Sequence, residues 1–151
     1  MIHGKFIWEH KELMIAEEIY RRGDSPLWEK DCAKNDSDFL VHGLVYEGTD
    51  DTCAAGAGCI IIQSDIGRLL KLAVLPEHRG KSYEEFLVRM LIDKAETGGV
   101  AQITISCKKE DSEFFRKLGF VESERENVLN KTAGVNMIYM ANSRKCCAKS
   151  I

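Results

Sequence analysis

The stretch that most constrains the fold runs from residue 68 to residue 86 and reads RLLKLAVLPEHRGKSYEEF. Its first part, residues 69–75, is apolar except for Lys71, which is the length and pattern of one sheet strand. Pro76 ends this strand, because proline lacks the N–H that an inner strand donates to its neighbour. We therefore expect the chain to leave a sheet at Pro76 and to enter a polar turn.

A helix is predicted directly after that turn. Ser82 and Glu85 have the S-x-x-E spacing of a capping box, in which the two side chains bond reciprocally to backbone N–H groups. Apolar residues then recur at helical spacing: Phe86, Leu87, Met90, Leu91 and Ala95. A strand, a basic turn and a helix N-terminus favour anion binding, since the first N–H groups of a helix lack partners within it. An ordinary strand-to-helix connection has the same appearance.

Two segments resemble the GNAT superfamily of acyl-CoA N-acyltransferases. LAVLPEHRGKSYEEFLVRMLIDKA is similar to the strand, loop and long helix that bind the cofactor in that family, and FFRKLGF, residues 114–120, is similar to its F-Y-x-K-L-G-F segment. The resemblance covers residues 68–122 directly. It implies an α/β (α+β) fold with a mixed central sheet flanked by helices. In that fold the strands at 68–75 and 100–106 splay apart and leave a slot for the pantetheine arm of the cofactor.

The remaining sequence predicts elements in an order compatible with that fold. Alternating or apolar runs predict strands at 2–8, 39–45, 53–63, 100–106, 120–126 and 134–141. Helices are predicted at 9–22, from Pro26 onward with Leu27, Trp28 and Cys32 as its apolar contacts, and from Glu110 or Asp111 to Leu118. The small residues 54–58 have two interpretations. We favour a bulge or a close approach of a helix over a bare surface for substrate.

Composition is that of an ordinary soluble globular chain, with 44% hydrophobic and 30% charged residues. The net charge of −3 gives no reason to expect nucleic acid, and no apolar run approaches the roughly 20 residues that cross a bilayer. The six cysteines form no C-x-x-C pair and the four histidines are scattered, so we expect reduced thiols and no metal. The expected organisation is one cytoplasmic domain, residues 1–142, with a flexible tail at 143–151.

The resemblance also implies which residues hold acetyl-CoA. Its diphosphate is expected on the loop of Arg79, Gly80, Lys81, Ser82, Tyr83 and Glu84, and its pantetheine along the main chain of Ala73, Val74 and Leu75. Lys108 and Phe115 are further cofactor positions, where the family has an Asn and a Tyr. Ser82 and Glu84 replace small residues, and the Glu84 carboxylate is expected to weaken diphosphate binding by on the order of 1 kcal/mol unless it turns to solvent. Glu84 also suits the N-terminus of a helix through the helix dipole.

The same comparison leaves the proton donor undecided. In many relatives the Tyr at the position of Phe115 protonates the departing thiolate, and a phenyl ring cannot do so. The thiolate then leaves unaided, takes a proton from water, or uses another group such as Tyr83, Cys107 or Ser112. The sequence thus predicts an N-acetyltransferase that acts on an amine of a small molecule or peptide. The alternative is a protein of this fold that binds acyl-CoA or another protein with weak or no catalysis. A homodimer is one possible assembly.

Overall fold

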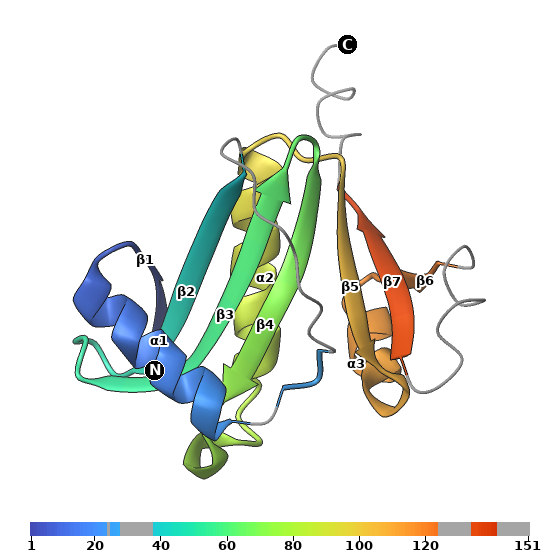
Figure 1. The fold of residues 1–151 in the computed structure, drawn as a ribbon. Helices are drawn as coiled ribbons and strands as arrows, with labels where there is room; N and C mark the ends of the chain where they lie inside the picture. Colours follow the sequence, from blue (N-terminus) through green and yellow to red (C-terminus); the bar gives the residue numbers. More distant parts are fainter. Residues whose placement is uncertain (24, 28–37, 124–133, 142–151) are drawn as a thin grey trace.

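The computed structural model describes residues 1–23, 25–27, 38–123 and 134–141. Within these residues seven strands form one mixed sheet in the order β1-β2-β3-β4-β5-β7-β6 (Figure 1). The strands are β1 (Ile2–Ile7), β2 (Phe39–Glu47), β3 (Cys53–Gln63), β4 (Ile66–Val74), β5 (Gln102–Lys108), β6 (Val121–Glu122) and β7 (Gly134–Met140). The helices are α1 (His10–Arg22), α2 (Tyr83–Thr97) and α3 (Ser112–Lys117), with short 3-10 helices η1 (Pro76–His78) and η2 (Lys109–Asp111).

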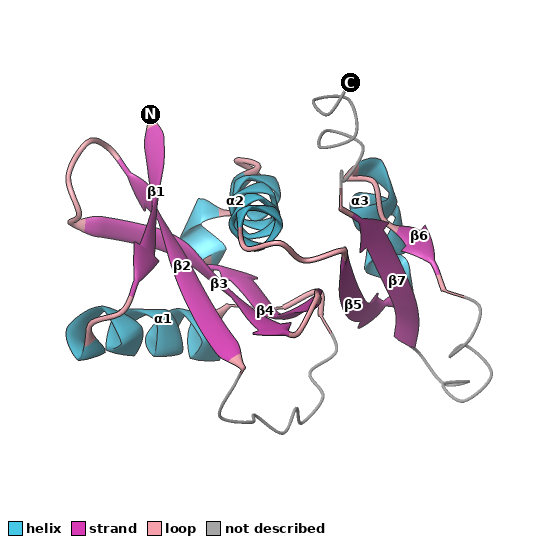
Figure 2. Ribbon diagram, turned by 90° about the horizontal axis from the view of Figure 1, so that it is seen from above, coloured by secondary structure: helices cyan, strands magenta, loops and turns pink. Residues whose placement is uncertain are grey.

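The helices cover both faces of the sheet. Figure 2 shows α1 beneath β2 to β4, and α2 and α3 on the opposite face. The face that α1 covers is packed by small and apolar side chains such as Ala16, Ala57 and Ala73. The other face forms the larger core, in which Leu87 and Leu91 of α2 join residues of β2 to β5, α3 and β7. This arrangement confirms the predicted mixed sheet flanked by helices. None of the helices in the described parts of the chain is long and apolar enough to pass through a membrane.

The stretch of small residues in β3 serves packing. Its register against β2 shifts so that Ala55 has no partner, which is the predicted bulge. A Cβ atom on Gly56 would lie 3.1 Å from Cδ1 of Leu87, and one on Gly58 would lie 2.8 Å from Cδ1 of Leu91. Since both leucines belong to α2, the glycines let that helix approach the sheet, which confirms the interpretation we favoured.

The two parallel strands β4 and β5 diverge along their length (Figure 1). They pair only through Ile66, Gly67 and Arg68, and the last pair joins Arg68 to Thr104. Beyond it, the edge of β4 that faces β5 has no strand partner among the described residues. This divergence confirms the splaying that the family resemblance implied. The apolar pattern alone does not contain it, because a buried strand looks the same whether one or two neighbours pair with it.

Two local predictions are wrong. Ser82 does precede α2, but it has a left-handed backbone (φ 63°) and its hydroxyl makes no capping hydrogen bond. A capping box needs an extended residue at that position, and Glu85 instead pairs with Nε of Arg89 at 2.9 Å. The helix predicted from Pro26 is also absent from residues 25–27, where Leu27 forms a bridge with Cys107 and the Pro26 carbonyl accepts from the Lys108 N–H. Trp28 and Cys32 lie outside the described residues.

Other boundaries move by a few residues. The strand predicted at 100–106 begins at Gln102, because the N–H of Val100 still bonds to Ala95 O and so belongs to the end of α2. Of the strand predicted at 120–126, the structure shows Val121–Glu122, and residues 124–126 lie outside the described part. The predicted tail at 143–151 also lies outside it.

Candidate active site

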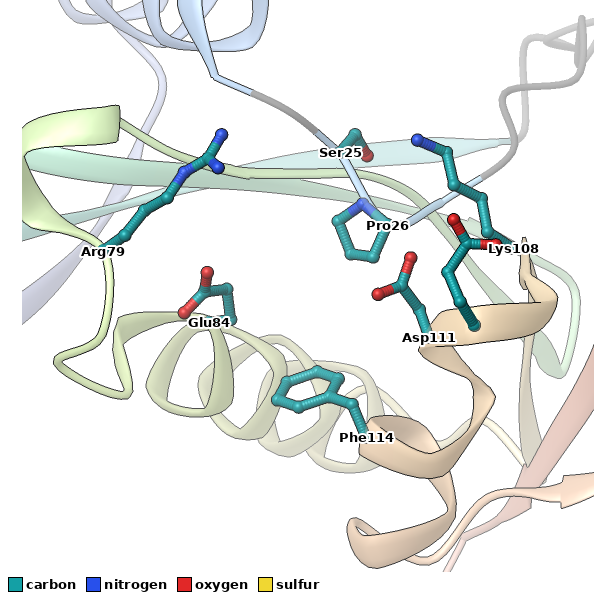
Figure 3. A pocket seen from close by; sticks show the side chains of 8 residues that line it. Ser25, Pro26, Arg79, Glu84, Lys108, Asp111 and Phe114 are labelled. Carbon is teal, nitrogen blue, oxygen red and sulfur yellow. The ribbon is translucent and has the colours of Figure 1, made fainter.

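A pocket of about 440 Å³ lies where β4 and β5 have separated (Figure 3). Its volume is in the range of small-molecule sites. The lining residues come from the segment before β2, the loop after β4, the start of α2, the end of β5, and the η2–α3 segment: Ser25, Pro26, Arg79, Glu84, Lys108, Glu110, Asp111 and Phe114. The pocket thus combines parts of the chain that are far apart in sequence.

The loop between β4 and α2 forms one wall of this pocket. Pro76 starts the single turn of η1, and the chain then passes through two left-handed residues, Gly80 (φ 81°) and Ser82 (φ 63°). Gly80 takes this conformation without strain, and a Cβ there would meet nothing within 4 Å. Helix α2 then starts at Tyr83, so its first N–H groups lie at the end of the loop.

The pocket has charges of both signs. Arg79 and Lys108 are its cations, and Glu84, Glu110 and Asp111 are its carboxylates. Figure 3 shows the Glu84 carboxylate directed into the pocket and not away from it. The pKa of Asp111 is raised, first by burial and then by the nearby charge of Glu110, while Lys108 opposes the shift. The sequence predicts that Glu84 weakens diphosphate binding unless its side chain turns to solvent. The side chain instead points into the pocket.

The opposite side of the same loop is bound to Glu47, the last residue of β2. Oε2 of Glu47 accepts hydrogen bonds from Nζ of Lys81 at 2.9 Å and from the Tyr83 hydroxyl at 2.5 Å. These two donors are the main causes that lower the pKa of Glu47 to about 2, and the bond to Glu47 raises the pKa of Tyr83 to about 12. Lys81 and Tyr83 were both predicted to contact the cofactor, and neither lines the pocket.

Two further side chains approach this carboxylate. Nδ1 of His78 lies 3.2 Å from Oε2 of Glu47, and Sγ of Cys53 lies 3.9 Å from Oε1. The ligand atoms of Glu47, Cys53 and His78 lie within 4.8 Å of one another, close enough to hold a metal ion. The sequence spacing could not reveal this group, because its members come from three separate segments. The Lys81 ammonium already balances the charge of Glu47, so a metal would have to displace it.

Comparison with known proteins identifies the family of this chain. The sequence profile of the acetyltransferase (GNAT) family matches residues 7–120. The chain belongs to the GNAT acetyltransferase family. No curated protein sequence matches it. Similar solved structures include a protein from Lactobacillus plantarum described as a putative N-acetyltransferase, with TM-score 0.72, 16% identity, and coverage of 93% of this chain and 98% of that chain.

Two other GNAT structures have functions in their descriptions. One is the ribosomal-protein-S18-alanine N-acetyltransferase from Escherichia coli, with TM-score 0.69, 18% identity, and coverage of 93% of this chain and 94% of that chain. The other is N-acetylglutamate synthase from Neisseria gonorrhoeae, complexed with coenzyme A and N-acetyl-glutamate. It has TM-score 0.66 and 16% identity, and the match covers 94% of this chain and 35% of that chain.

Phe115, at the family's Tyr position, does not lie in the pocket of this GNAT chain. It is fully buried, with edge-on ring contacts to Phe114 at 5.0 Å and Phe120 at 5.6 Å between centroids. Adjacent residues of a helix point about 100° apart, so only one of the two phenylalanines can face the core. The family resemblance made Phe115 a cofactor position; in the structure Phe114, and not Phe115, lines the pocket.

The three predicted proton donors are all engaged elsewhere. The Tyr83 hydroxyl donates to Glu47, and the Ser112 hydroxyl donates to Lys109 O at 2.8 Å. Cys107 is fully buried with Sγ 3.8 Å from Sδ of Met137, and burial raises the pKa of its thiol to about 11. None of the three lines the pocket.

Ala73 and Val74 end β4, one of the two strands that form the slot, and Leu75 follows them. Ala73 pairs with Ala57 of β3, and the N–H of Leu75 bonds to Ala55 O. In a strand the backbone groups point alternately to the two sides, so those of Val74 are directed to the β5 side. The pocket residues that the sequence missed are Ser25, Pro26, Glu110, Asp111 and Phe114. Only the tertiary structure, which brings their segments beside the β4 loop, reveals them.

Proposed function

We propose that this GNAT chain transfers an acetyl group from acetyl-CoA to an amine of a small molecule or peptide. The observation that supports this most is the pocket at the mouth of the slot, where the start of α2, Arg79 and Lys108 meet beside the unpaired edge of β4. A helix N-terminus with two cations suits phosphate, and a strand edge suits the amides of pantetheine.

Most of the pocket fits coenzyme A. Helix α2 has 15 residues, long enough for a developed dipole, and its first N–H groups follow the two left-handed residues of the loop. Arg79 and Lys108 provide charge-assisted bonds for phosphate oxygens. Glu84, Glu110 and Asp111 act against this, because their carboxylates share the pocket with the two cations. We expect a weakened but retained affinity, since each such charge changes binding by on the order of 1 kcal/mol.

Several residues of the slot and its pocket have roles in this proposal. The coenzyme would supply the thioester whose carbonyl the amine attacks. Val74 would bond the pantetheine through its backbone, while Pro26 and Phe114 would exclude water from one wall of the slot. The attacking amine must lose a proton, to a nearby base or to water, as it forms the bond to the thioester carbonyl.

The direct test is a thermal melt with and without CoA and acetyl-CoA, followed by acetyl transfer to a panel of amines. We expect both coenzymes to raise Tm and at least one class of amine to be acetylated. Absence of a Tm shift at millimolar coenzyme, in wild type and in Glu84→Gly alike, would refute the proposal.

A second candidate function is coenzyme or protein binding with weak or no catalysis. It is favoured by Phe115 at the position where many relatives have the acid, and by Glu84 in the pocket. It predicts a Tm shift with CoA and no turnover on any amine. It would be excluded by efficient turnover on any amine of the panel.

The domain organisation, location and assembly of the protein are also proposals. We propose that residues 1–142 form one GNAT domain, that the protein is cytoplasmic, and that it forms homodimers through strands near the C-terminus. Cys53 and Cys107 are free thiols, which suits a reducing compartment. Cell fractionation and sedimentation at two protein concentrations test the location and the assembly.

A further inference from the structure

Four polar side chains form a row across three strands, on the same face of the sheet as α1. The row consists of Arg68 on β4, Thr104 and Ser106 on β5, and Asn136 on β7. Arg68 pairs with Thr104, and Ser106 pairs with Asn136. Paired residues share a face, as do residues two apart on one strand, so the four side chains lie side by side.

The side of the sheet follows from the register of β3. Arg68 pairs with Ile61, which lies on the same face as Ala57, and Ala57 packs against α1. Helix α1 itself contacts β2, β3 and β4. Figure 2 shows no helix of the described residues over β5 and β7 on that side.

The row contains buried polar atoms without hydrogen-bond partners. These atoms are Nε of Arg68, Oγ1 of Thr104 and Nδ2 of Asn136, and the described residues contain just one other buried side-chain atom of this kind, Nδ1 of His78. Asn136 is 7% exposed, and its Oδ1 accepts a bond from the Ser106 hydroxyl at 2.6 Å, which leaves the amide nitrogen as its unused group. Buried polar groups are nearly always paired, so three unpaired ones side by side indicate that a ligand pairs them.

The chemistry of the three groups indicates what the ligand offers. Arg68 Nε and Asn136 Nδ2 can only donate, and the Thr104 hydroxyl can donate as well. No ion pair joins Arg68 to any carboxylate in the described part of the chain. Three donors beside the charge of the Arg68 guanidinium together select an anion with several acceptor oxygens.

The position of the row relates it to the slot. Arg68 and Thr104 are the last paired residues before β4 and β5 separate, so the row starts where the slot ends. The coenzyme pocket opens at the far ends of the same two strands, among residues that follow β4 and β5. A molecule bound on the row therefore meets the slot at its closed end, on the face opposite to α2.

We propose that this row binds a carboxylate group of the acceptor, so that the acceptor is an amino acid or another amine that carries a carboxylate. This inference rests on the proposed acetyl transfer. Arg68 binds the carboxylate through its guanidinium, and Thr104 and Asn136 donate to the remaining lone pairs. The carboxylate fits because it presents two oxygens in one plane to a planar guanidinium.

The experiment compares matched acceptors that differ in one group: L-amino acids, their amides and the corresponding decarboxylated amines. With acetyl-CoA as donor, we expect wild type to favour the amino acids over the amides at least about tenfold in kcat/KM, which corresponds to one charge-assisted contact. Arg68→Met removes this preference and Arg68→Lys restores part of it. Lys71→Met, a loss of charge on the same strand face outside the row, keeps the preference. Equal use of acids and amides, or a preference that survives Arg68→Met, overturns the proposal, as does a stronger preference for phosphorylated amines.

A second measurement needs no substrate. Unpaired buried polar groups cost stability in the free protein, so Arg68→Met and Thr104→Val are expected to leave Tm unchanged or to raise it. A purely structural role for the row predicts the opposite, a clear fall in Tm for both variants.

The two proposals fail in different ways. If no amine is acetylated, the proposed function fails, while a Tm increase of wild type but not of Arg68→Met with amino acids still supports the carboxylate site. If amines are acetylated without regard to their carboxylate, the function stands and the carboxylate site is refuted.

Discussion

The loop between β4 and α2 has two sides that differ in how their charges are used. On the β2 side, Lys81 and Tyr83 both bond to the single carboxylate of Glu47. On the pocket side, Arg79 shares a cavity with Glu84 and with the charges of β5 and η2. The first side holds the loop to β2, and the second brings cations and carboxylates to the pocket. The comparison teaches that the basic residues of one short motif face different surroundings, Lys81 a carboxylate at the end of β2 and Arg79 the pocket.

The largest effect is expected from removing the Glu47 carboxylate, which accepts both hydrogen bonds on the β2 side of the loop. Glu47→Ala leaves the Lys81 ammonium and the Tyr83 hydroxyl without their common acceptor, so we expect the largest fall in Tm among variants of this loop, together with weaker CoA binding. Tyr83→Phe removes one of the two bonds and should give a smaller fall. Thermal melts compare the fall in Tm of these two variants. Cys53→Ser, which changes a longer contact to Glu47, serves as the control. A Glu47→Ala protein as stable as wild type would show that the loop is held by its backbone alone.

The second prediction concerns how much Arg79 and Lys81 each contribute to CoA binding. We expect Arg79→Ala to weaken CoA binding about tenfold, the loss that follows from removing roughly 1.4 kcal/mol of interaction. Lys81→Ala should change it less than about threefold, because its ammonium is directed to Glu47. Isothermal titration with CoA at fixed ionic strength compares the two. Equal losses would mean that Lys81 leaves Glu47 when the coenzyme binds, and the distinction between the two sides would fail.

The third prediction concerns the carboxylate on the pocket side. Removing the Glu84 charge should tighten CoA binding about fivefold, since repulsion on the order of 1 kcal/mol is lost. Glu84→Gln tests the charge at nearly constant size, and Glu84→Gly adds the small residue that the family motif has. Glu113→Gln, which removes a carboxylate that pairs with Arg116 on α3, serves as the control. If Glu84→Gly tightens binding and Glu84→Gln does not, the side chain obstructs the pocket by its size.

The smallest effect is a dependence of stability on pH. The pKa of Glu47 falls from 4.5 to about 2 in the folded protein, so its stabilisation is fully present above pH 4.5 and is lost as the pH falls toward 2. The difference in urea midpoint between wild type and Glu47→Gln should therefore shrink as the pH falls through this window. Because other carboxylates titrate there too, the difference between the two proteins is the quantity to follow. A constant difference from pH 6 to pH 2 would contradict the assignment.

Several features followed from the sequence because they depend on neighbouring residues. The strand that Pro76 ends, the helix that starts at Tyr83 and the glycine turn between them come from local patterns, and the structure has all three. The small residues of β3 predicted the close approach of α2 for the same reason, since the absence of side chains is a local property. The capping box failed because Ser82 satisfies the spacing while its backbone is left-handed, a conformation that the pattern does not encode.

The site depended on information that local patterns do not carry. Whether Lys81 points to Glu47 or to the pocket is decided by the end of β2, a separate strand, and whether Phe114 or Phe115 faces the pocket is decided by how α3 packs on the core. The polar row from Arg68 to Asn136 exists only because β4, β5 and β7 lie side by side in a fixed register. The sequence by itself determined the elements and the family, through periodicity and two motifs. Only the tertiary structure decided which charges meet, because pairing and burial are properties of residues brought together from distant parts of the chain.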